Sequence, residues 1–309
     1  MFIMNATKII QILTNTLRLI LQILYYICES VYYHIFGLQE KNVTGEIVLI
    51  TGAGHGIGKE LAIQYACLGA KVVCLDMNKQ TNEETAKEIK EKIGKDVYTY
   101  QCDVTRREEV FAVAHKVREE VGEVTILINN AGIMPCHTFL DHTADEILKI
   151  FNVNVLAHFW ILQAYLPSMI EKNYGHIVAL SSMAGIVGLP YLVPYSSSKY
   201  AVHGLMEALE EELRVTSKRK SLIKFTTIYP YMVDTGLCKK PKINQILNSL
   251  LLLSSPKDTA AQIIKAQRQN IKMRTIPLFW LSLVSFGRMF PDNAQNSIKD
   301  YIDSGVEPS

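Results

Sequence analysis

The sequence has few cysteines, and they are scattered. Its 309 residues include six cysteines, and no two of them form a C-x-x-C pair. A disulfide framework or a structural zinc site usually needs cysteines at short, regular spacings. We therefore expect reduced thiols facing a cytosolic environment, and no metal site. The six are Cys28, Cys67, Cys74, Cys102, Cys136 and Cys238.

The sequence also lacks a strong net charge, internal repeats and low-complexity segments. Its formal net charge is +2, and a nearly balanced charge gives no reason to expect nucleic acid as a partner. A chain of 309 residues has room for one large α/β domain and some additional chain.

A long uninterrupted apolar run is missing too, although the N-terminal segment comes close to one. Residues 9–36 are strongly apolar and aromatic, but Arg18 and Glu29 leave an uncharged run of only ten residues between them. A clean membrane span needs roughly 20. Residues 1–37 show no convincing small-x-small cleavage site of a signal peptide, and a helix packed into the core remains an alternative. Because tyrosines favour the headgroup level of a bilayer, we favour a membrane anchor, either spanning or monotopic.

The first motif is a glycine-rich turn between a strand and a helix. Residues 46–50 (EIVLI) have a buried-strand pattern, residues 51–58 (TGAGHGIG) follow directly, and an amphipathic helix opens at Lys59. This order places backbone N–H groups and a helix N-terminus where a pyrophosphate can bind. Side chains in place of the glycines would block the turn or the approach of the phosphates. The expected cofactor-binding residues of the turn are Gly52, His55, Gly56, Ile57 and Gly58.

An acidic residue ends the next strand and bears on the choice of cofactor. Residues 71–75 (KVVCL) lead to Asp76, 18 residues beyond Gly58, where a carboxylate can accept hydrogen bonds from the adenosine ribose. It would also repel a 2′-phosphate, by about 4 kcal/mol for unit charges 4 Å apart at an effective dielectric of 20. No Arg or Lys directly follows Asp76, and the turn carries His55 rather than a firm cation. The sequence therefore predicts NAD, with NADP less favoured.

Further strand and helix patterns alternate along the chain. Residues 96–100 and 124–128 read as strands, and residues 105–121 read as a helix. Such alternation predicts an α/β fold, a Rossmann-type parallel sheet wound on both faces that binds ligands at the carboxyl ends of its strands. Asp103 and Asn130 fall at two such ends, where they either contact the cofactor or form turns.

The run Tyr195-Ser-Ser-Ser-Lys199 carries the candidate chemistry. On a helix, residues four apart share one face, so the phenol and the ammonium would lie side by side. A nearby positive charge favours the phenolate and lowers the tyrosine pKa. The pair could then take a proton from an alcohol or return one to a carbonyl. Alone, the pattern is more typical of an amphipathic helix with a stacked tyrosine and a surface lysine.

The motifs together resemble those of a known family. TGxxxGxG at 51–58, NNAG at 129–132, a serine thirteen residues before Tyr195, and the YxxxK pair occur in order. This combination resembles the short-chain dehydrogenase/reductases over residues 44–280. The sequences of residues 44–58 and 154–160 are similar to those of a membrane- and lipid-droplet-associated branch of this family. That branch contains epidermal retinol dehydrogenases and certain 17β-hydroxysteroid dehydrogenases.

The resemblance implies roles for individual residues. Tyr195 would be the general acid/base, and Lys199 would lower its pKa and bond the nicotinamide ribose. Ser182 would hold the substrate oxygen and share its developing charge. Asn154 would support a water relay from the lysine, and Thr235 would bond the nicotinamide carboxamide.

Neighbouring residues are weaker candidates for the same roles. Strand alternation separates Ser181 from Ser182, and the family spacing selects Ser182; Asn152 is likewise the weaker asparagine. The sequence differs from the family pattern at Pro230-Tyr231, where the family usually has Pro-Gly. This difference affects the expected shape of the loop over the nicotinamide but not the expected chemistry.

The resemblance also implies a function. We expect residues 1–37 to associate with a membrane, residues 44–285 to form a single dehydrogenase domain, and residues 286–309 to form a tail. The domain would interconvert a lipophilic alcohol, such as a retinoid or hydroxysteroid, and its carbonyl. It would face the cytosol at the endoplasmic reticulum or a lipid droplet. A homodimer through helices at about 155–173 and 195–215 is a family expectation. The competing hypothesis is a non-enzymatic membrane or lipid-droplet scaffold that retains a nucleotide fold.

Three C-terminal segments complete the predictions. Residues 246–253 are apolar and lie where the family has a segment that covers the substrate, or they form a core helix. Residues 276–286 are a second apolar patch that contacts a membrane, lines the substrate entrance or packs. Residues 303–309 read as a frayed terminus.

Overall fold

The apolar N-terminal segment folds as a single helix. In the computed structural model, which describes residues 6–238, 241–242, 253–302 and 305–307, helix α1 spans Ala6–Phe36. It belongs to the smaller of two compact units, Met1–Lys41, whereas all the predicted motifs belong to the larger, Asn42–Ser309. The predicted N-terminal hydrophobic helix is confirmed.

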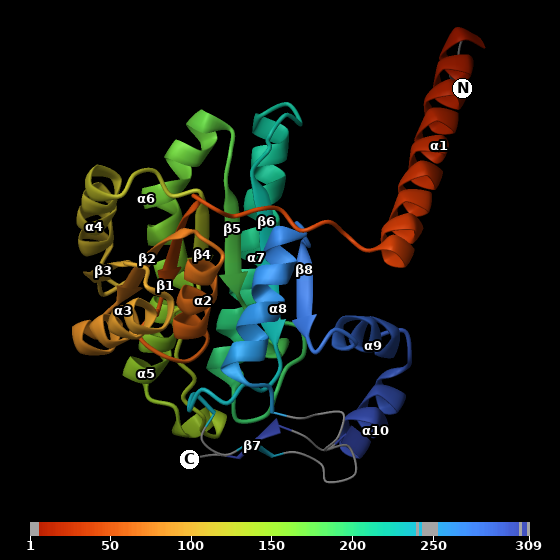
Figure 1. Ribbon diagram of the computed structural model, residues 1–309. Coiled ribbons are helices and arrows are strands. Elements are labelled where there is room, and N and C mark those ends of the chain that lie inside the picture. Colours follow the sequence, from red (N-terminus) through yellow and green to blue (C-terminus); the bar gives the residue numbers. More distant parts are fainter. Residues whose placement is uncertain (1–5, 239–240, 243–252, 303–304, 308–309) are drawn as a thin grey trace. The chain divides into compact units, whose positions relative to one another are not determined.

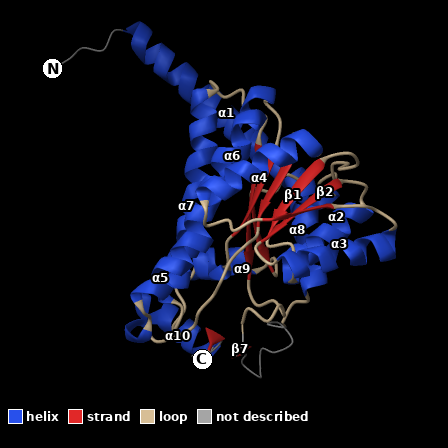
Figure 2. Ribbon diagram, turned by 90° about the vertical axis from the view of Figure 1, so that its left-hand side faces the viewer, coloured by secondary structure: helices blue, strands red, loops and turns tan. Residues whose placement is uncertain are grey.

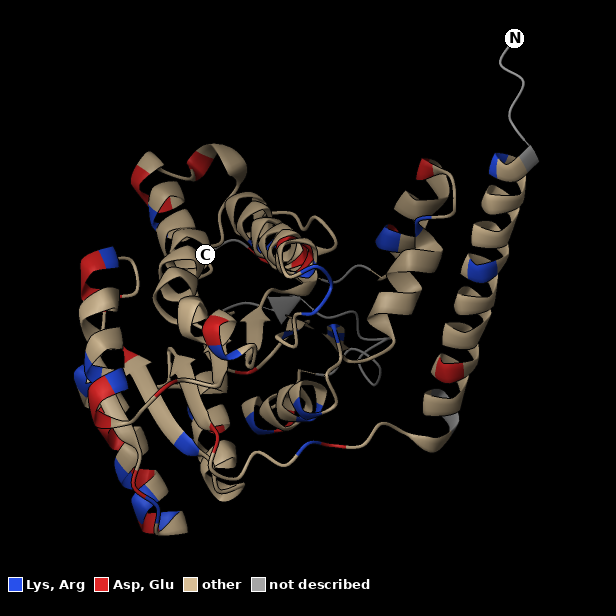
Figure 3. Ribbon diagram, turned by 90° about the horizontal axis from the view of Figure 1, so that it is seen from above, with Lys and Arg blue, Asp and Glu red and all other residues tan. Residues whose placement is uncertain are grey.

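The large apolar side chains of α1 are exposed. Their exposed fractions run from 41% for Ile9 to 70% for Phe36. Charged residues are sparse along this helix, which carries the N label in Figure 3. Thr7–Tyr33 has a mean hydropathy of 1.2 and is long and apolar enough to cross a membrane. Polar residues such as Gln11, Arg18 and Gln22 recur on one side of the helix, and a helix with a broad exposed apolar surface and few charges is typical of a membrane-associated segment.

The larger unit is built on a seven-stranded parallel sheet with strand order β3-β2-β1-β4-β5-β6-β8. Chain order reverses between β1 and β4, so the connections that follow these two strands run to opposite faces of the sheet and leave a crevice for a ligand between them. The predicted doubly wound parallel sheet is confirmed. The strands are β1 (Ile47–Thr51), β2 (Lys71–Asp76), β3 (Tyr98–Gln101), β4 (Ile126–Asn129), β5 (His176–Leu180), β6 (Lys224–Pro230) and β8 (Met273–Ile276).

Helices cover both faces of the sheet, as Figures 1 and 2 show. Helices α2 (Gly56–Cys67), α3 (Lys79–Ile93) and α8 (Pro256–Arg268) pack on one face, and α4 (Arg107–Glu120), α6 (Ala157–Lys172) and α7 (Val193–Thr216) pack on the other.

Side-chain alternation along the strands supplies both cores. Ile50 and Ile128 join the core under α2 and α8, whereas their neighbours Leu49 and Leu127 join the core under α4, α6 and α7. Because both faces are buried, the strands read as continuous apolar runs rather than alternating ones.

Short elements join these layers on the way to the carboxyl ends of the strands. Helix α5 (Ala144–Phe151) passes through a π-helical turn (Asn152–Leu156) directly into α6. The 3₁₀ turns are Phe139–Asp141 and Met183–Gly185. A π turn inside a helix rotates the residues that follow it and is frequent at functional sites.

The C-terminal region departs from the predictions. Residues 303–309 were expected to fray, but β9 (Gly305–Val306) pairs antiparallel with β7 (Pro241–Lys242), and Val306 is buried. Ladder hydrogen bonds and an apolar contact therefore hold a segment whose composition is that of a loose tail.

The two apolar C-terminal segments have different outcomes. Residues 246–252 lie outside the described residues. Residues 276–286 run from the end of β8 into α9 (Trp280–Gly287), where Trp280 is buried while Phe279 and Phe286 are exposed; α10 (Asp292–Ile302) follows.

Candidate active site

The glycine-rich turn joins β1 to α2 and forms a cradle that side chains would fill. The φ angle of Gly56 is +56°, in the left-handed region that favours glycine. A Cβ at Gly58 would lie 2.0 Å from the carbonyl oxygen of Gly52, so only glycine fits there. Helix α2 starts at Gly56, and its first N–H groups have no partner within the helix. A cradle of this kind, at a helix N-terminus, fits the pyrophosphate of a dinucleotide.

Asp76 ends β2 beside this turn and is fixed by two backbone N–H groups. Gly54 N donates to its Oδ2 at 2.9 Å, and Asn78 N donates to its Oδ1 at 2.9 Å. Each carboxylate oxygen has a second lone pair. The side chain is thus held in place and can still accept a hydrogen bond from a ribose hydroxyl.

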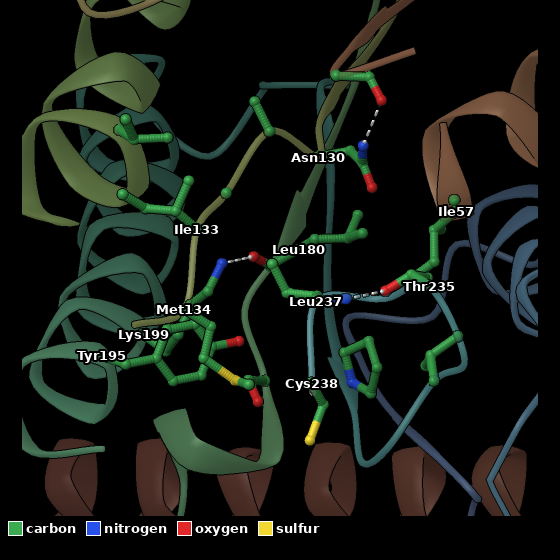
Figure 4. A pocket seen from close by; sticks show the side chains of 18 of the residues that line it. Ile57, Asn130, Ile133, Met134, Leu180, Tyr195, Lys199, Thr235, Leu237 and Cys238 are labelled. Atoms are coloured by element: carbon green, nitrogen blue, oxygen red, sulfur yellow. Dashed lines mark hydrogen bonds between the residues drawn. The ribbon is translucent and has the colours of Figure 1, made fainter. Parts of the chain in front are cut away.

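Asn130 links the ends of β4 and β1. Its Nδ2 donates to the carbonyl oxygens of Thr51 at 2.9 Å and Gly52 at 3.2 Å, and its backbone N donates to Thr51 Oγ1 at 3.0 Å. These hydrogen bonds fix the start of the glycine-rich turn, and Asn130 also lines the cavity seen in Figure 4.

Asp103 forms a turn of its own after β3. Its Oδ1 accepts from Thr105 N at 3.0 Å and from Thr105 Oγ1 at 2.7 Å. Asp103 lines the same cavity. Asp103 and Asn130 are therefore both turn formers, and their contact with the cofactor stays a prediction.

Thr235 closes the cavity from the opposite side of the turn. A Cβ at Gly56 would lie 3.1 Å from both Cβ and Cγ2 of Thr235, and Leu237 N donates to Thr235 Oγ1 at 3.3 Å (Figure 4). Tyr231, at the position where the family has glycine, donates its backbone N–H to Ile276 O at 2.9 Å. Its ring packs against Trp280 with 5.1 Å between the ring centres.

Tyr195 and Lys199 lie one turn apart near the start of α7. Lys199 Nζ is 5.7 Å from the centre of the Tyr195 ring and donates to Leu180 O at 2.8 Å. Ser182, two residues beyond that carbonyl, is hydrogen-bonded to Tyr195. Strand β5 and helix α7 thus bring the three side chains to one wall of the cavity, where Figure 4 shows Tyr195 and Lys199.

Burial dominates the pKa of both titratable groups, which corrects one prediction. Proximity to Lys199 was expected to lower the pKa of Tyr195, but burial raises it to about 12, against the lowering effect of the hydrogen bond with Ser182. Burial also lowers the pKa of Lys199 to about 8. The phenol is 6% exposed among apolar side chains, so desolvation of the phenolate outweighs the influence of an ammonium that points to the Leu180 carbonyl.

Asn154 lies behind this wall in the π-helical turn and is fully buried. Its Oδ1 accepts from Ile133 N at 2.9 Å, and its Nδ2 donates to Ile133 O at 3.0 Å and to Ser198 Oγ at 3.1 Å. The amide therefore joins the loop after β4 to α7 next to Lys199. Gly132 in that loop lies close to both side chains, since a Cβ built there would be in van der Waals contact with Asn154 Oδ1 at 3.4 Å and Lys199 Nζ at 3.5 Å.

One cavity of about 930 Å³ brings most of the predicted residues together. Asn154 and Gly58 do not line it and instead support residues that do. The predicted residues on its wall are Gly52, His55, Gly56, Ile57, Asp76, Asp103, Asn130, Ser182, Tyr195, Lys199 and Thr235. Both weaker candidates, Ser181 and Asn152, also reach it.

Apolar wall residues near Tyr195 are the part of the site that sequence reasoning missed. They come from four segments that are far apart in the chain, and no motif or spacing in the sequence marks them. They are Met134, Leu189, Leu192, Met232, Leu237 and Val306. At the end of the cavity near Asp76, sequence reasoning also missed Met77 and Asn78, which line the cavity. Their position directly after Asp76 in the sequence could have identified them. Among residues that the structure describes, no cluster of three His, Cys, Asp or Glu side chains could hold a metal ion.

Comparison with known proteins identifies relatives of this chain. A family described as short chain dehydrogenase matches residues 46–245. Epidermal retinol dehydrogenase 2 of Mus musculus is 40% identical over 276 residues, which cover 89% of this chain and 88% of that protein. 17-beta-hydroxysteroid dehydrogenase 13 of Homo sapiens is 38% identical over 283 residues, or 92% of each chain.

A solved structure shares the architecture. The crystal structure of an NAD⁺-bound xylitol dehydrogenase is similar with a TM-score of 0.67 and 26% identity, over 76% of this chain and 99% of that one.

Proposed function

The chain belongs to the short-chain dehydrogenase family, and on that premise we propose that it interconverts a lipophilic alcohol and its carbonyl with NAD. It is an oxidoreductase of CH–OH groups that uses a nicotinamide cofactor. The choice of NAD, the individual roles of the site residues and the class of alcohol belong to the proposal.

One observation carries the proposal. Ser182, Tyr195 and Lys199 share a wall of a cavity whose other end is the glycine cradle and Asp76, and the rest of its surface near Tyr195 is apolar. A dinucleotide held at the cradle and an apolar alcohol beside Tyr195 would therefore share one enclosed space. A scaffold without catalysis would need neither a buried lysine nor a tyrosine beside it, so the enzyme is favoured over the scaffold.

The proton steps are assigned to three side chains. In oxidation Tyr195 takes the proton of the alcohol, and in reduction it returns one to the carbonyl oxygen. Ser182 donates a hydrogen bond to the substrate oxygen as its charge develops. Lys199 supports the phenolate electrostatically, and Asn154 positions it by linking the Ile133 backbone to the Ser198 hydroxyl, next to Lys199. When bound, the nicotinamide supplies the hydride chemistry.

The preference for NAD rests on Asp76. Its carboxylate is fixed by Gly54 and Asn78 and lines the cavity beside the glycine cradle. The residues that follow, Met77 and Asn78, bring no positive charge to balance a 2′-phosphate. A fixed, uncompensated negative charge at this end of the cavity disfavours NADP.

The class of substrate rests on the apolar wall and on the relatives. Leu192, Met232 and Val306 belong to one buried cluster with Tyr195. Two relatives are named for retinol and for 17-beta-hydroxysteroids, both lipophilic alcohols. Such substrates partition into membranes, so the exposed apolar helix α1 supports a site of action at a membrane or lipid-droplet surface of the endoplasmic reticulum, with the catalytic unit in the cytosol.

Turnover by the purified protein tests the proposal. Full-length chain in liposomes is assayed with all-trans-retinol and with oestradiol, each with NAD and with NADP, and product formation is measured. We expect turnover with NAD, and a loss of kcat of about 10²–10⁴-fold in Tyr195→Phe, since the variant has no group to move the proton. NAD binding should persist in the variant. A Tyr195→Phe enzyme within tenfold of the unmodified chain would refute the role of Tyr195.

A further inference from the structure

The C-terminal strand β9 reaches the catalytic cavity, although nothing in its sequence suggests it. Gly305 pairs with Lys242 and Val306 pairs with Pro241, antiparallel. Cys136 Sγ donates a hydrogen bond to Glu307 O at 3.4 Å. The segment is thus attached on one side to β7 and on the other to the loop after β4.

Val306 lies against the catalytic tyrosine. Its side chain is 7% exposed and belongs to the same buried cluster as Tyr195, Leu192 and Met232. Burying a valine side chain removes apolar surface from water, which stabilises the contact. The apolar contact therefore helps to hold β9 at the site as well as shaping the wall.

Val306 also lies where two cavities meet. It lines the catalytic cavity of about 930 Å³ and a second cavity of about 630 Å³, which extends past Cys136, His137 and Glu146. Leu237 and Cys238 line both cavities as well, and Figure 4 shows these two residues beside the catalytic pair. The space available to a substrate beyond Tyr195 therefore depends on the side chain at position 306.

We propose that β9 is the distal wall of the substrate site and that Val306 is a specificity-determining residue that limits the length of the apolar alcohol. This inference rests on the proposed function for the identity of the ligand class. A larger side chain at 306 would shorten the space beside Tyr195. A smaller one would open it towards the second cavity and admit a longer apolar body.

The first experiment measures the change in substrate preference. Val306→Phe and Val306→Ala are assayed as full-length protein in liposomes, and the ratio of kcat/KM for all-trans-retinol to that for butan-1-ol is compared with that of the unmodified chain. One methylene in an apolar pocket changes discrimination by about 10–200-fold. We expect the ratio to fall at least about tenfold in Val306→Phe and to rise in Val306→Ala.

A matched variant separates wall effects from loss of stability. Val113 in α4 is also 7% exposed but belongs to the core under α4, α6 and α7. Val113→Ala removes the same atoms from an equally buried site, so its ratio should equal that of the unmodified chain. Should Val306→Phe fail to fold, Val306→Ala still decides the question. A ratio unchanged in the folded Val306 variants would overturn the specificity role.

The second experiment does not depend on turnover. Alkylation of the cysteines by N-ethylmaleimide is followed residue by residue with mass spectrometry, in the full chain and in a chain that lacks residues 305–309. Removing the wall should accelerate modification of Cys136 and Cys238 at least about tenfold, because access to a thiol controls its reaction. Exposed Cys67 and buried Cys74 provide the two reference rates.

The two experiments keep the two proposals distinguishable. If the full chain turns over no alcohol, the proposed function fails, and the alkylation rates still decide whether β9 closes the cavity. If it turns over retinol but neither the ratio nor the alkylation rates respond, the proposed function stands and the distal wall is refuted.

Discussion

The two units of the chain break the usual pattern of burial in opposite ways. In α1, large apolar side chains such as Leu13 and Phe36 are more than 60% exposed. In the catalytic unit, the polar side chains of Lys199 and Asn154 are only 4% and 0% exposed. Neither arrangement is favourable in water without compensation, because exposed apolar surface and buried polar or charged groups each cost free energy.

The two units offset these free-energy costs in different ways. Around Lys199 the compensation is internal, since the ammonium donates to Leu180 O and Asn154 satisfies Ile133 and Ser198. Along α1 the described residues offer no such cover, so its compensation has to come from outside the unit. Hydropathy alone does not separate these cases. The run Ala144–Lys172 has a mean hydropathy of 1.3, close to the 1.2 of Thr7–Tyr33, yet it is 44% buried and the other is not buried at all.

The largest expected effect is the loss of membrane binding on deletion of residues 1–37. Inserting even three of the apolar side chains of α1 would contribute about 1.5–3 kcal/mol each, so the partition coefficient onto liposomes should fall at least about 10³-fold. Sedimentation with liposomes measures it. NAD binding by the truncated chain should persist, because the sheet is complete without α1.

Two results would contradict this prediction. A truncated chain that still binds liposomes fully would move the anchor to residues 246–253 or 276–286. A truncated chain that unfolds would instead make α1 a core helix, and the comparison between the two units would no longer hold.

Replacing the buried charge should affect catalysis next most strongly. Lys199→Met removes the ammonium beside Tyr195 and leaves Leu180 O without that donor, so kcat/KM should fall about 10²–10³-fold, as for other losses of electrostatic stabilisation. Steady-state kinetics measure the effect. Lys272→Met, on an exposed lysine paired with Glu210, is the matched control and should retain full activity. An equal loss in both variants would show that the effect is not specific to the buried site.

The pH dependence of kcat/KM for oxidation tests whether burial sets the pKa values of Tyr195 and Lys199. Oxidation needs the Tyr195 phenolate and the Lys199 ammonium, whose pKa values lie at about 12 and about 8. Below pH 8 the phenolate fraction rises tenfold per pH unit while Lys199 stays charged, and above pH 8 the loss of the ammonium offsets that gain. The logarithm of kcat/KM for oxidation should therefore rise with unit slope to about pH 8 and then level off.

Lys199→Arg tests this assignment, because a guanidinium stays charged throughout the range. Its profile should continue to rise above pH 8. A plateau that begins below pH 7 in the unmodified chain would place the pKa of Tyr195 far below the value that burial gives it.

The smallest expected effect concerns the cofactor. Asp76→Ala should improve kcat/KM for NADP relative to NAD at least about tenfold, because it removes the repulsion of a 2′-phosphate. Asp76→Asn is the control for shape, since its oxygen can still accept from a backbone N–H while the charge is gone. If NADP already serves the unmodified chain as well as NAD, the electrostatic role of Asp76 is wrong.

Local sequence patterns were enough to predict the strands, the glycine-rich turn and the helix that carry the site. The apolar runs that became β1, β2 and β4 were recognisable because a strand buried on both faces is a nearly continuous run of apolar side chains. The glycines of the 51–58 turn and the spacing from Tyr195 to Lys199 were equally readable, since turn geometry and helical periodicity act within a few residues. The family resemblance supplied the roles of Ser182 and Asn154.

Only the tertiary structure decided features that depend on residues distant in the chain. Asn154 acts through Ile133 and Ser198, which no local pattern connects to it. The pKa of Tyr195 is raised rather than lowered because the assembled cluster around it removes water, and burial is a property of the whole fold. Val306 reaches the catalytic wall for the same reason. Its strand is too short to show a periodicity, and its position follows from pairing with β7 and from the apolar surface that folding had already gathered around Tyr195.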